Sequence, residues 1–160
     1  MNTDELSLQE RYGPEGICFG CGPKNAKGLR IRSFKSEDNE DEYVLKFRPQ
    51  DHHQAFPGVI NGGIIGALFD CHMNWAAAVK LYELHPEEDF PSTVTSTFTI
   101  NLKRPTPAEK DLFVRAWIEE IRDNFVDTKA EMIVDGKITA TASGTFVAVH
   151  EGHPAFHRWI

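Results

Sequence analysis

The chain has 160 residues, of which 41% are hydrophobic and 11 are Phe, a composition that suits one globular domain with a substantial core. Its formal net charge of −7 argues against nucleic acid, because binding to nucleic acid depends on neutralising phosphates. No stretch approaches ~18 uninterrupted apolar residues, and the acidic start lacks the order of a secretory signal. An odd number of cysteines, 3, does not make a disulfide framework. Together these features lead us to expect a cytoplasmic protein that binds neither nucleic acid nor a membrane.

Residues 1–27 are predicted to form an arm followed by a turn that contains two cysteines. Residues 1–16 are polar and contain glycines and a proline, which is typical of a mobile arm or a short helix. Cys18 and Cys21 have the spacing of half a tetrahedral zinc site, but no second pair follows them in the chain. A glycine-rich turn with two thiols is therefore favoured over its two alternatives, a metal site completed by another chain and redox chemistry. We assign no metal ligand.

Two short strands are predicted over residues 29–35 and 43–47, where apolar and polar side chains alternate on either side of an acidic loop. Residues 51–58 then lead to a long helix. His52 and His53 lie close enough to reach the start of this helix, although adjacent histidines in a loop are more often exposed to solvent than functional.

The rest of the chain is organised around the stretch 61–84, which predicts a helix over residues 64–79. Apolar side chains cover nearly every face, a pattern typical of a helix enclosed by its domain. Asp70 interrupts this pattern in the middle of the helix. A carboxylate removed from water costs several kcal/mol unless it accepts hydrogen bonds or raises its pKa, so Asp70 needs a structural or chemical reason.

The start of the same helix offers hydrogen-bond donors. Asn61 is a favoured N-cap residue, and Gly62 and Gly63 carry no side chains to screen their amide N–H groups. These groups lie at the positive end of the helix dipole, so a substrate carbonyl could approach them as in an oxyanion hole.

The carboxylate of Asp70 and the amides at the start of the helix cannot serve one reaction within a single chain. Gly63 and Asp70 are seven residues apart, which is roughly 10 Å along a helix axis. One carbonyl cannot lie ~3 Å from both. If they act together, Asp70 must come from a second, antiparallel copy of the helix in a homodimer. The simpler alternative is an N-cap followed by a buried Asp70 that pairs with a neighbour such as Asn74.

Four strands are predicted after the helix, over residues 93–102, 111–121, 125–134 and 137–149. Asp135-Gly136 is a strong signal for a two-residue hairpin turn. The pattern indicates an α+β fold, an antiparallel sheet with one long helix against it. Alternation in the first strand predicts two faces, one with Val94, Ser96, Phe98, Ile100 and Leu102 and the other with Thr93, Thr95, Thr97, Thr99 and Asn101.

The predicted domain spans residues 28–149, and residues 150–160 form a C-terminal tail. The three histidines of the tail have helical spacing but lie on both sides of Pro154, so no metal site is assigned to them.

This arrangement resembles the hotdog-fold acyl-CoA thioesterases, especially the branch of the phenylacetic-acid pathway and the human thioesterase superfamily. The resemblance rests on Pro57-Gly-Val-Ile-Asn-Gly-Gly63, on Asp70, and on the strand that ends Asn101-Leu-Lys-Arg-Pro105. It covers roughly residues 28–149, and the opening Cys18-Phe-Gly-Cys21-Gly also looks like that of some uncharacterised members. It implies a hotdog fold, a sheet wrapped around one long central helix.

The resemblance also implies roles for individual residues. Asp70 would be the catalytic carboxylate, as general base or nucleophile, and Gly62 the amide donor to the thioester oxygen. Thr95 matches a hydroxyl that orients the water beside the carboxylate. The chain departs from the branch at Asn61, where His is usual, and at Ala55, where Asn is frequent. Other substrate contacts would come from Gly63, from His53 or Gln54 in place of the missing Asn, and from Lys103 and Arg104, with Arg122 and Lys129, at the CoA phosphates.

The function that the resemblance implies is hydrolysis of an acyl-CoA to the free acid and CoA. The site would lie at a homodimer interface, the dimers could pair into a homotetramer, and no cofactor would be needed beyond the CoA of the substrate. One alternative is a non-catalytic hotdog protein that binds acyl-CoA or a related small ligand, although such a binder has no use for Asp70. A hydratase is a weaker alternative, because Asp70 and His72 are two residues apart and point to different faces.

Overall fold

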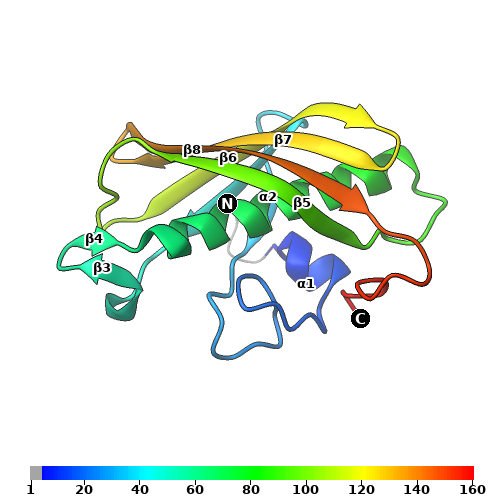
Figure 1. Ribbon diagram of the computed structural model, residues 1–160, viewed down its shortest axis with the longest axis horizontal. Helices are drawn as coiled ribbons and strands as arrows, with labels where there is room; N and C mark the ends of the chain where they lie inside the picture. The colour runs from blue at the N-terminus through cyan, green and yellow to red at the C-terminus, as the bar shows by residue number, and fades with distance from the viewer. Residues whose placement is uncertain (1–4) are drawn as a thin grey trace.

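A six-stranded antiparallel sheet wraps around one long helix in the computed structural model, which describes residues 5–160 (Figure 1). The order across the sheet is β1-β2-β6-β7-β8-β5, and the expected α+β fold is confirmed. Residues 1–4, the start of the predicted arm, lie outside the described part. The strands are β1 (Ser33–Lys35), β2 (Glu42–Phe47), β5 (Thr93–Leu102), β6 (Leu112–Arg122), β7 (Phe125–Val134) and β8 (Lys137–Ala148).

The helix α2 (Gly62–Leu84) lies across one face of the sheet, and its middle is buried on all sides. Its hydrophobic side chains meet those that β6 and β7 present by alternation, among them Val114 and Val126, both almost fully buried. The enclosed helix predicted from the sequence is therefore confirmed, and it is longer than predicted. No helix among residues 5–160 combines the length and apolar character needed to cross a bilayer.

The first strand is shorter than the prediction of residues 29–35. The backbone N–H groups of Leu29 and Ile31 donate to the carbonyls of Phe19 and Gly20 instead of to a neighbouring strand. Arg30 between them has a φ of 55°, which is not an extended conformation. The cysteine-containing loop thus binds this segment, and a strand forms only from Ser33 onward.

A bulge in the edge strand β5 corrects the predicted division of its faces. Thr95 pairs with Phe146 and Thr97 pairs with the adjacent Thr145, so Ser96 is the extra residue. The alternation reverses there. As a result Thr95 lies on the same side as Ile100 and Leu102, facing α2, whereas strict alternation predicted opposite sides.

Short turns complete the path of the chain. Asp135 and Gly136 have φ values of 50° and 74°, which confirms the predicted hairpin. The sequence did not reveal the turn η1 (Asp51–His53) and the small hairpin of β3 (Gln54–Phe56) and β4 (Val59–Ile60) that precede α2.

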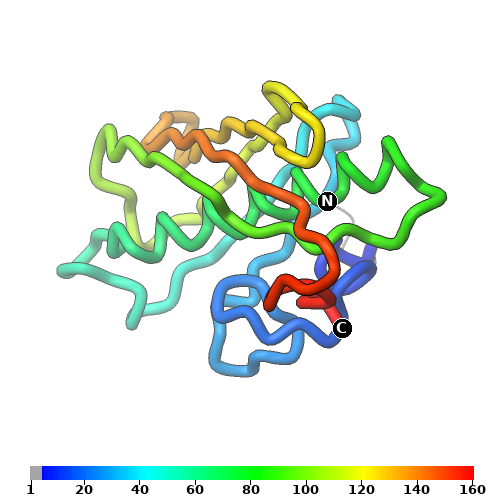
Figure 2. Tube along the Cα trace, turned by 45° about the vertical axis from the view of Figure 1, so that its right-hand side comes forward, coloured from blue at the N-terminus to red at the C-terminus, as the bar shows by residue number. Residues whose placement is uncertain are grey.

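The two terminal segments pack on the same core, where Figure 2 shows them close together. The predicted arm contains the short helix α1 (Leu8–Tyr12), which begins with a capping box at Ser7. Trp159 of the tail packs against Trp75 of α2 with 4.4 Å between the ring centroids. Both segments therefore contribute to the enclosure of the helix.

A buried polar network joins α1 to the centre of the molecule. The Nε2–H of His72 donates to the carbonyl of Tyr43 at 3.1 Å, so Nδ1 accepts from the hydroxyl of Ser33 at 2.8 Å. The amide of Gln9 donates to this hydroxyl at 3.0 Å and accepts from the N–H of Ser33 at 2.8 Å. Burial lowers the pKa of His72 to about 4, so the imidazole is neutral.

We expect Gln9→Ala to lower the free energy of unfolding by about 1–3 kcal/mol, because Ser33 would lose two buried hydrogen bonds. Arg11→Ala, an exposed position on the same short helix, is the matched control and should change stability by less than about 0.5 kcal/mol. Urea unfolding measures both. Equal stability of the two variants would contradict the role of the network.

Candidate active site

The start of α2 is capped in a way that leaves one amide free. The Oδ1 atom of Asn61 accepts from the N–H of Gly63 at 2.8 Å and of Ile64 at 3.2 Å. The carbonyl of Asn61 accepts from the N–H of Ile65. Within residues 5–160 the N–H of Gly62 has no acceptor. Gly62 is therefore the amide that is available to a ligand at the positive end of the helix, while the amide of Gly63 is occupied by the cap.

The end of β5 covers this helix start. A side-chain carbon at Gly62 would lie 3.4 Å from the Cδ1 atom of Leu102, an ordinary contact distance, so the end of the strand packs directly over this position. Lys103 and Arg104 follow directly, and both are exposed. Neither forms an ion pair among the described residues, and their backbone N–H groups donate to Thr139. Two cations are thus free for an anionic ligand beside Gly62.

The two other cations suggested by the sequence are engaged on the sheet. Arg122 binds Asp127 at 2.9 Å, and Lys129 binds Glu119 at 3.2 Å. These ion pairs make Lys103 and Arg104 the better candidates for binding phosphate.

Asp70 pairs with Thr95 across the space between helix and strand. The hydroxyl of Thr95 donates to Oδ1 of Asp70 at 2.6 Å, a contact that the bulge at Ser96 makes geometrically available. The alternative pairing with Asn74 is not formed, because the amide of Asn74 donates to the carbonyl of Thr93 instead. The second carboxylate oxygen, Oδ2, has no donor within residues 5–160, and the side chain is only partly buried.

The groups around Asp70 have opposite effects on the pKa of its carboxyl group. Burial raises the pKa of Asp70, and the nearby Cys18 adds to this increase. The hydrogen bond from Thr95 and the guanidinium of Arg158 lower the pKa and offset part of the increase. A carboxylate in this setting is a stronger base than one in water, while its anionic form keeps specific partners.

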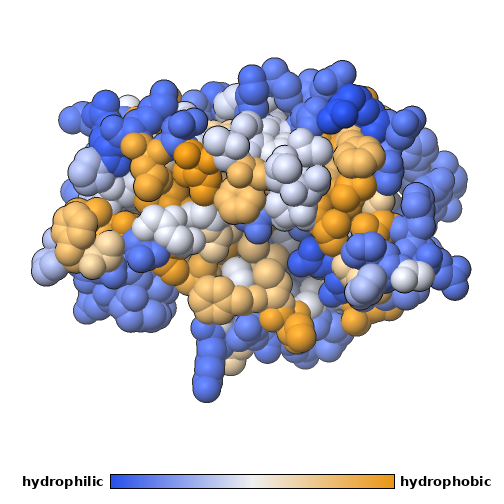
Figure 3. Space-filling view, viewed as in Figure 1, coloured by the Kyte–Doolittle hydropathy of each residue, from blue (hydrophilic) through white to orange (hydrophobic). Residues whose placement is uncertain are grey.

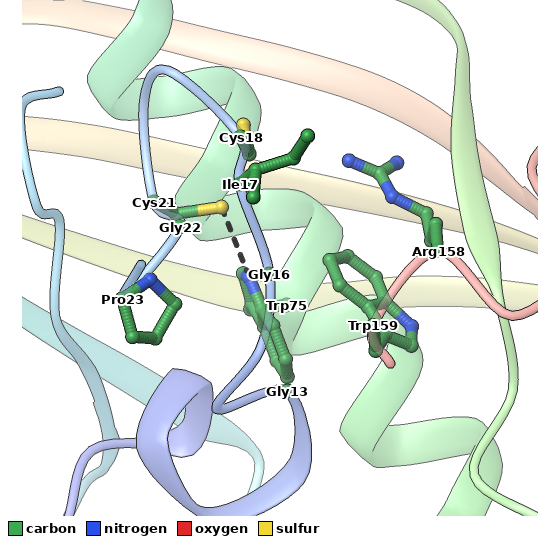
Figure 4. Close-up of a pocket in the computed structure, with 10 residues that line it drawn as sticks. All are labelled: Gly13, Gly16, Ile17, Cys18, Cys21, Gly22, Pro23, Trp75, Arg158 and Trp159. Atoms are coloured by element: carbon green, nitrogen blue, oxygen red, sulfur yellow. Dashed lines mark hydrogen bonds between the residues drawn. The ribbon is translucent and has the colours of Figure 1, made fainter. Parts of the chain in front are cut away.

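A cavity of about 220 Å³ lies beside the middle of α2 (Figure 4). Cys18, Cys21 and Arg158 line it together with the rings of Trp75 and Trp159. Asp70 does not belong to this lining. The tail residue Arg158 could not be placed here from the sequence, because its position depends on the hydrogen bond that it donates to the carbonyl of Thr93 at 2.8 Å.

Cys71 was also missed as a partner of the two loop cysteines. The three sulfur atoms of Cys18, Cys21 and Cys71 all lie within 4.8 Å of one another. Hydrogen bonds from Cys21 and Cys71 lower the pKa of Cys18, whereas Cys18 raises the pKa of Cys71. The chain has 3 cysteines in all, and this count was the one signal in the sequence that they gather.

His53 and Gln54, suggested as substrate contacts, have structural partners in the loop before α2. The Nδ1 atom of His53 accepts from the N–H of Gln50 at 2.9 Å, and burial lowers the pKa of this imidazole. The side chain of Gln54 accepts from the N–H of Gly58 and donates to the carbonyl of Asp51. The carbonyl of His53 also accepts from the N–H of Asn61, so these contacts position the start of the helix.

The single chain brings together Asp70 and Thr95 but not Gly62. Gly62 and Asp70 lie on one continuous helix, so about 12 Å of helix axis separate them. They lie about two turns apart on a stripe that faces β5, since a side-chain carbon at Gly66 between them would lie 3.4 Å from the Cδ1 atom of Ile100. A site that uses both features therefore needs a second chain.

Comparisons with known proteins show what this fold is similar to. No protein-family model matches the chain, and no curated protein does. Among solved structures, a thioesterase superfamily protein from Shewanella loihica has 24% identity and a TM-score of 0.62, over 75% of this chain and 91% of that one. A phenylacetic acid degradation-related protein from Ralstonia eutropha has 22% identity and a TM-score of 0.69, over 89% and 99%.

A thioesterase from Haemophilus influenzae is similar as well, with 19% identity and a TM-score of 0.66 over 78% of this chain and 84% of that one. The sheet that encloses one central helix is the fold these structures share. The chain therefore has the hotdog fold, as the resemblance in the sequence implied.

We expect Asn61→Ala to lower the free energy of unfolding by about 0.5–2 kcal/mol, because the side chain caps two amides of α2. Asn61→Asp keeps the capping oxygen and should retain most of the stability. Urea unfolding at one fixed protein concentration compares the three proteins. A stability of Asn61→Ala equal to that of the parent chain would contradict the capping geometry.

Proposed function

We propose that the protein hydrolyses acyl-CoA thioesters at the interface between two antiparallel copies of α2. The observation that carries this proposal is the pair of Asp70 and Thr95, which presents a partly buried carboxylate with one free oxygen. The uncapped amide of Gly62 supplies the second requirement of the reaction. The thioesterases among the similar structures support the same reaction class.

The proposed reaction needs one polarised carbonyl and one activated water. The N–H of Gly62 donates to the thioester oxygen and stabilises the negative charge that develops there. Asp70 of the partner chain accepts a proton from water through its free oxygen, while Thr95 holds the other oxygen. The water oxygen bonds to the carbonyl carbon, the carbon–sulfur bond breaks, and the CoA thiolate takes the proton from Asp70. If Asp70 is instead the nucleophile, water hydrolyses the resulting anhydride.

The edge strand β5 supports a dimer that completes such a site. No strand among residues 5–160 pairs with its outer edge. Phe98 and Leu102 on this strand are 42% and 59% exposed. Figure 3 shows apolar side chains on the face formed by β5 and the start of α2. Pairing of this edge with a second copy would bury them and bring two helices together.

Lys103 and Arg104 would bind the phosphates of CoA in this arrangement. They follow Leu102, whose side chain contacts the position of Gly62. A thioester carbonyl at Gly62 would therefore place the rest of the cofactor near two cations that form no ion pair with any of residues 5–160.

Replacing Asp70 tests the proposed reaction. Turnover of a panel of acyl-CoA substrates is measured through the release of the free CoA thiol. It should fall by about 100-fold or more in Asp70→Asn, because the base is lost. Asp127→Asn is the matched control, since Asp127 accepts a hydrogen bond of the same length, 2.6 Å, from Thr145 on the opposite face of the sheet. It should keep parental activity.

The same panel distinguishes an enzyme from a ligand-binding protein. Saturable binding of acyl-CoA by the parent chain without turnover would contradict the proposed hydrolysis, as would full activity in Asp70→Asn.

A charge placed on the edge of β5 tests the dimer. Phe98→Asp should give a monomer in light scattering and lose turnover, because the carboxylate would oppose burial of this edge. Phe113→Asp replaces a Phe that is 45% exposed on β6 and should retain both the parental mass and the activity. An active Phe98→Asp monomer would show that one chain suffices.

A further inference from the structure

The three cysteines of the chain converge from two distant segments. Cys18 and Cys21 belong to the glycine-rich loop, and Cys71 belongs to the middle of α2. The sulfur atoms of Cys18 and Cys71 are 3.8 Å apart, and all three lie within 4.8 Å of one another. Zinc–sulfur bonds of about 2.3 Å in a tetrahedron place two sulfurs about 3.8 Å apart. The observed spacing is therefore close to that of ligands around one ion.

The loop is shaped to reach the helix at this point. A side-chain carbon at Gly20 would lie 2.4 Å from the sulfur of Cys71, so any other residue would displace either the loop or this sulfur. A carbon at Gly22 would lie 2.4 Å from the N atom of Cys18. The turn between the two loop cysteines is closed by the N–H of Gly22, which donates to the carbonyl of Cys18 at 2.8 Å.

A hydrogen-bond donor lies on one of the sulfurs. The indole N–H of Trp75 donates to the sulfur of Cys21 at 3.3 Å. A donor of this kind orients a thiolate ligand and compensates part of its charge in a metal site. Packing of three thiols alone gives no reason for this donor.

A fixed cation lies across the cavity that borders this cluster. Arg158 lines the cavity with Cys18 and Cys21 (Figure 4). Its position is held by the bond to the carbonyl of Thr93 and by the ring of Trp159, 4.3 Å away. Three thiolates and one divalent ion carry a net charge of −1, which this guanidinium can balance.

We propose that Cys18, Cys21 and Cys71 bind one zinc ion, with the fourth position filled by water from the cavity. Thiolates are the ligands that select zinc over harder divalent ions. The ion would join the N-terminal loop to the central helix beside the proposed active site. This assignment does not depend on the thioesterase activity.

Metal content and a spectroscopic probe test the proposal on the whole chain of 160 residues without an affinity tag. Protein purified under a phosphine reductant should contain about one zinc per chain by mass spectrometry of the metal. After removal of zinc, Co²⁺ should give a sulfur-to-cobalt charge-transfer band with a stoichiometry of one. Because the chain has 3 cysteines, this band can come only from the proposed ligands.

Variants connect the band to these residues. Cys18→Ser and Cys71→Ser should each weaken Zn²⁺ affinity by more than about 100-fold, beyond the effect of losing an outer contact. His85→Ala is the matched control, because His85 lies in the other group of potential ligands, an exposed one with Glu87 and Glu88. It should leave zinc content unchanged. Circular dichroism verifies that each variant folds.

Three results would overturn the proposal. The first is a fully reduced protein that has three free thiols and neither retains zinc nor gives the cobalt band. The second is zinc content that is lost in His85→Ala but kept in both cysteine variants. The third is copper as the sole metal retained. None of these results bears on the acyl-CoA assay, so the two proposals fail independently.

Discussion

The structure depends on the burial of one helix that carries a carboxylate in its middle. Enclosure of α2 by the sheet buries its apolar side chains in the core, but the same enclosure partly removes Asp70 from water, which is unfavourable without a donor. The hydroxyl of Thr95 is that donor. The bulge at Ser96 turns this hydroxyl toward the helix, so an irregularity of one residue in the edge strand reconciles an apolar interior with a charged group.

The same enclosure separates the two features that could act on a substrate. The free amide of Gly62 and the carboxylate of Asp70 are fixed at different heights of a rigid helix, and no side-chain rotation brings them together. The edge of β5, which pairs with no other strand of residues 5–160 and carries exposed apolar side chains, runs along the same side of the helix. The proposed hydrolysis is therefore tied to the proposed dimer. A second chain that covers the edge of β5 would also bring its own Asp70 to the Gly62 amide of the first chain.

Much of the fold could be predicted from the sequence because its signals are local. Apolar coverage of the central stretch, alternation over residues 125–134 and the Asp135-Gly136 turn each determine their element without help from distant residues. The resemblance to a known family predicted Thr95 beside Asp70 as a hydroxyl that orients a water, and the structure shows a direct hydrogen bond between the two side chains. Alternation alone placed Thr95 on the wrong side, since the pattern contains no signal for the extra residue at Ser96.

Other parts of the site could not be predicted because they depend on tertiary contacts. Arg158 reaches the centre of the molecule only when the tail packs on Trp75, and Cys71 meets the loop cysteines only when Gly20 lies against the helix. Chain order separates these partners by 50 residues or more. Sequence motifs for metal sites detect ligands that are close together along the chain. They therefore do not detect a third thiol that lies on a distant helix.

The cap on α2 has a consequence for ligand selection. Helix starts that bind phosphate or carboxylate present several N–H groups to several oxygens at once. Here the side chain of Asn61 occupies two of those donors, and one remains without an acceptor in the described part of the chain. Such a terminus suits a ligand with a single neutral acceptor and disfavours a multidentate anion, so the residue that begins the helix also acts as a filter for the functional group that can dock there.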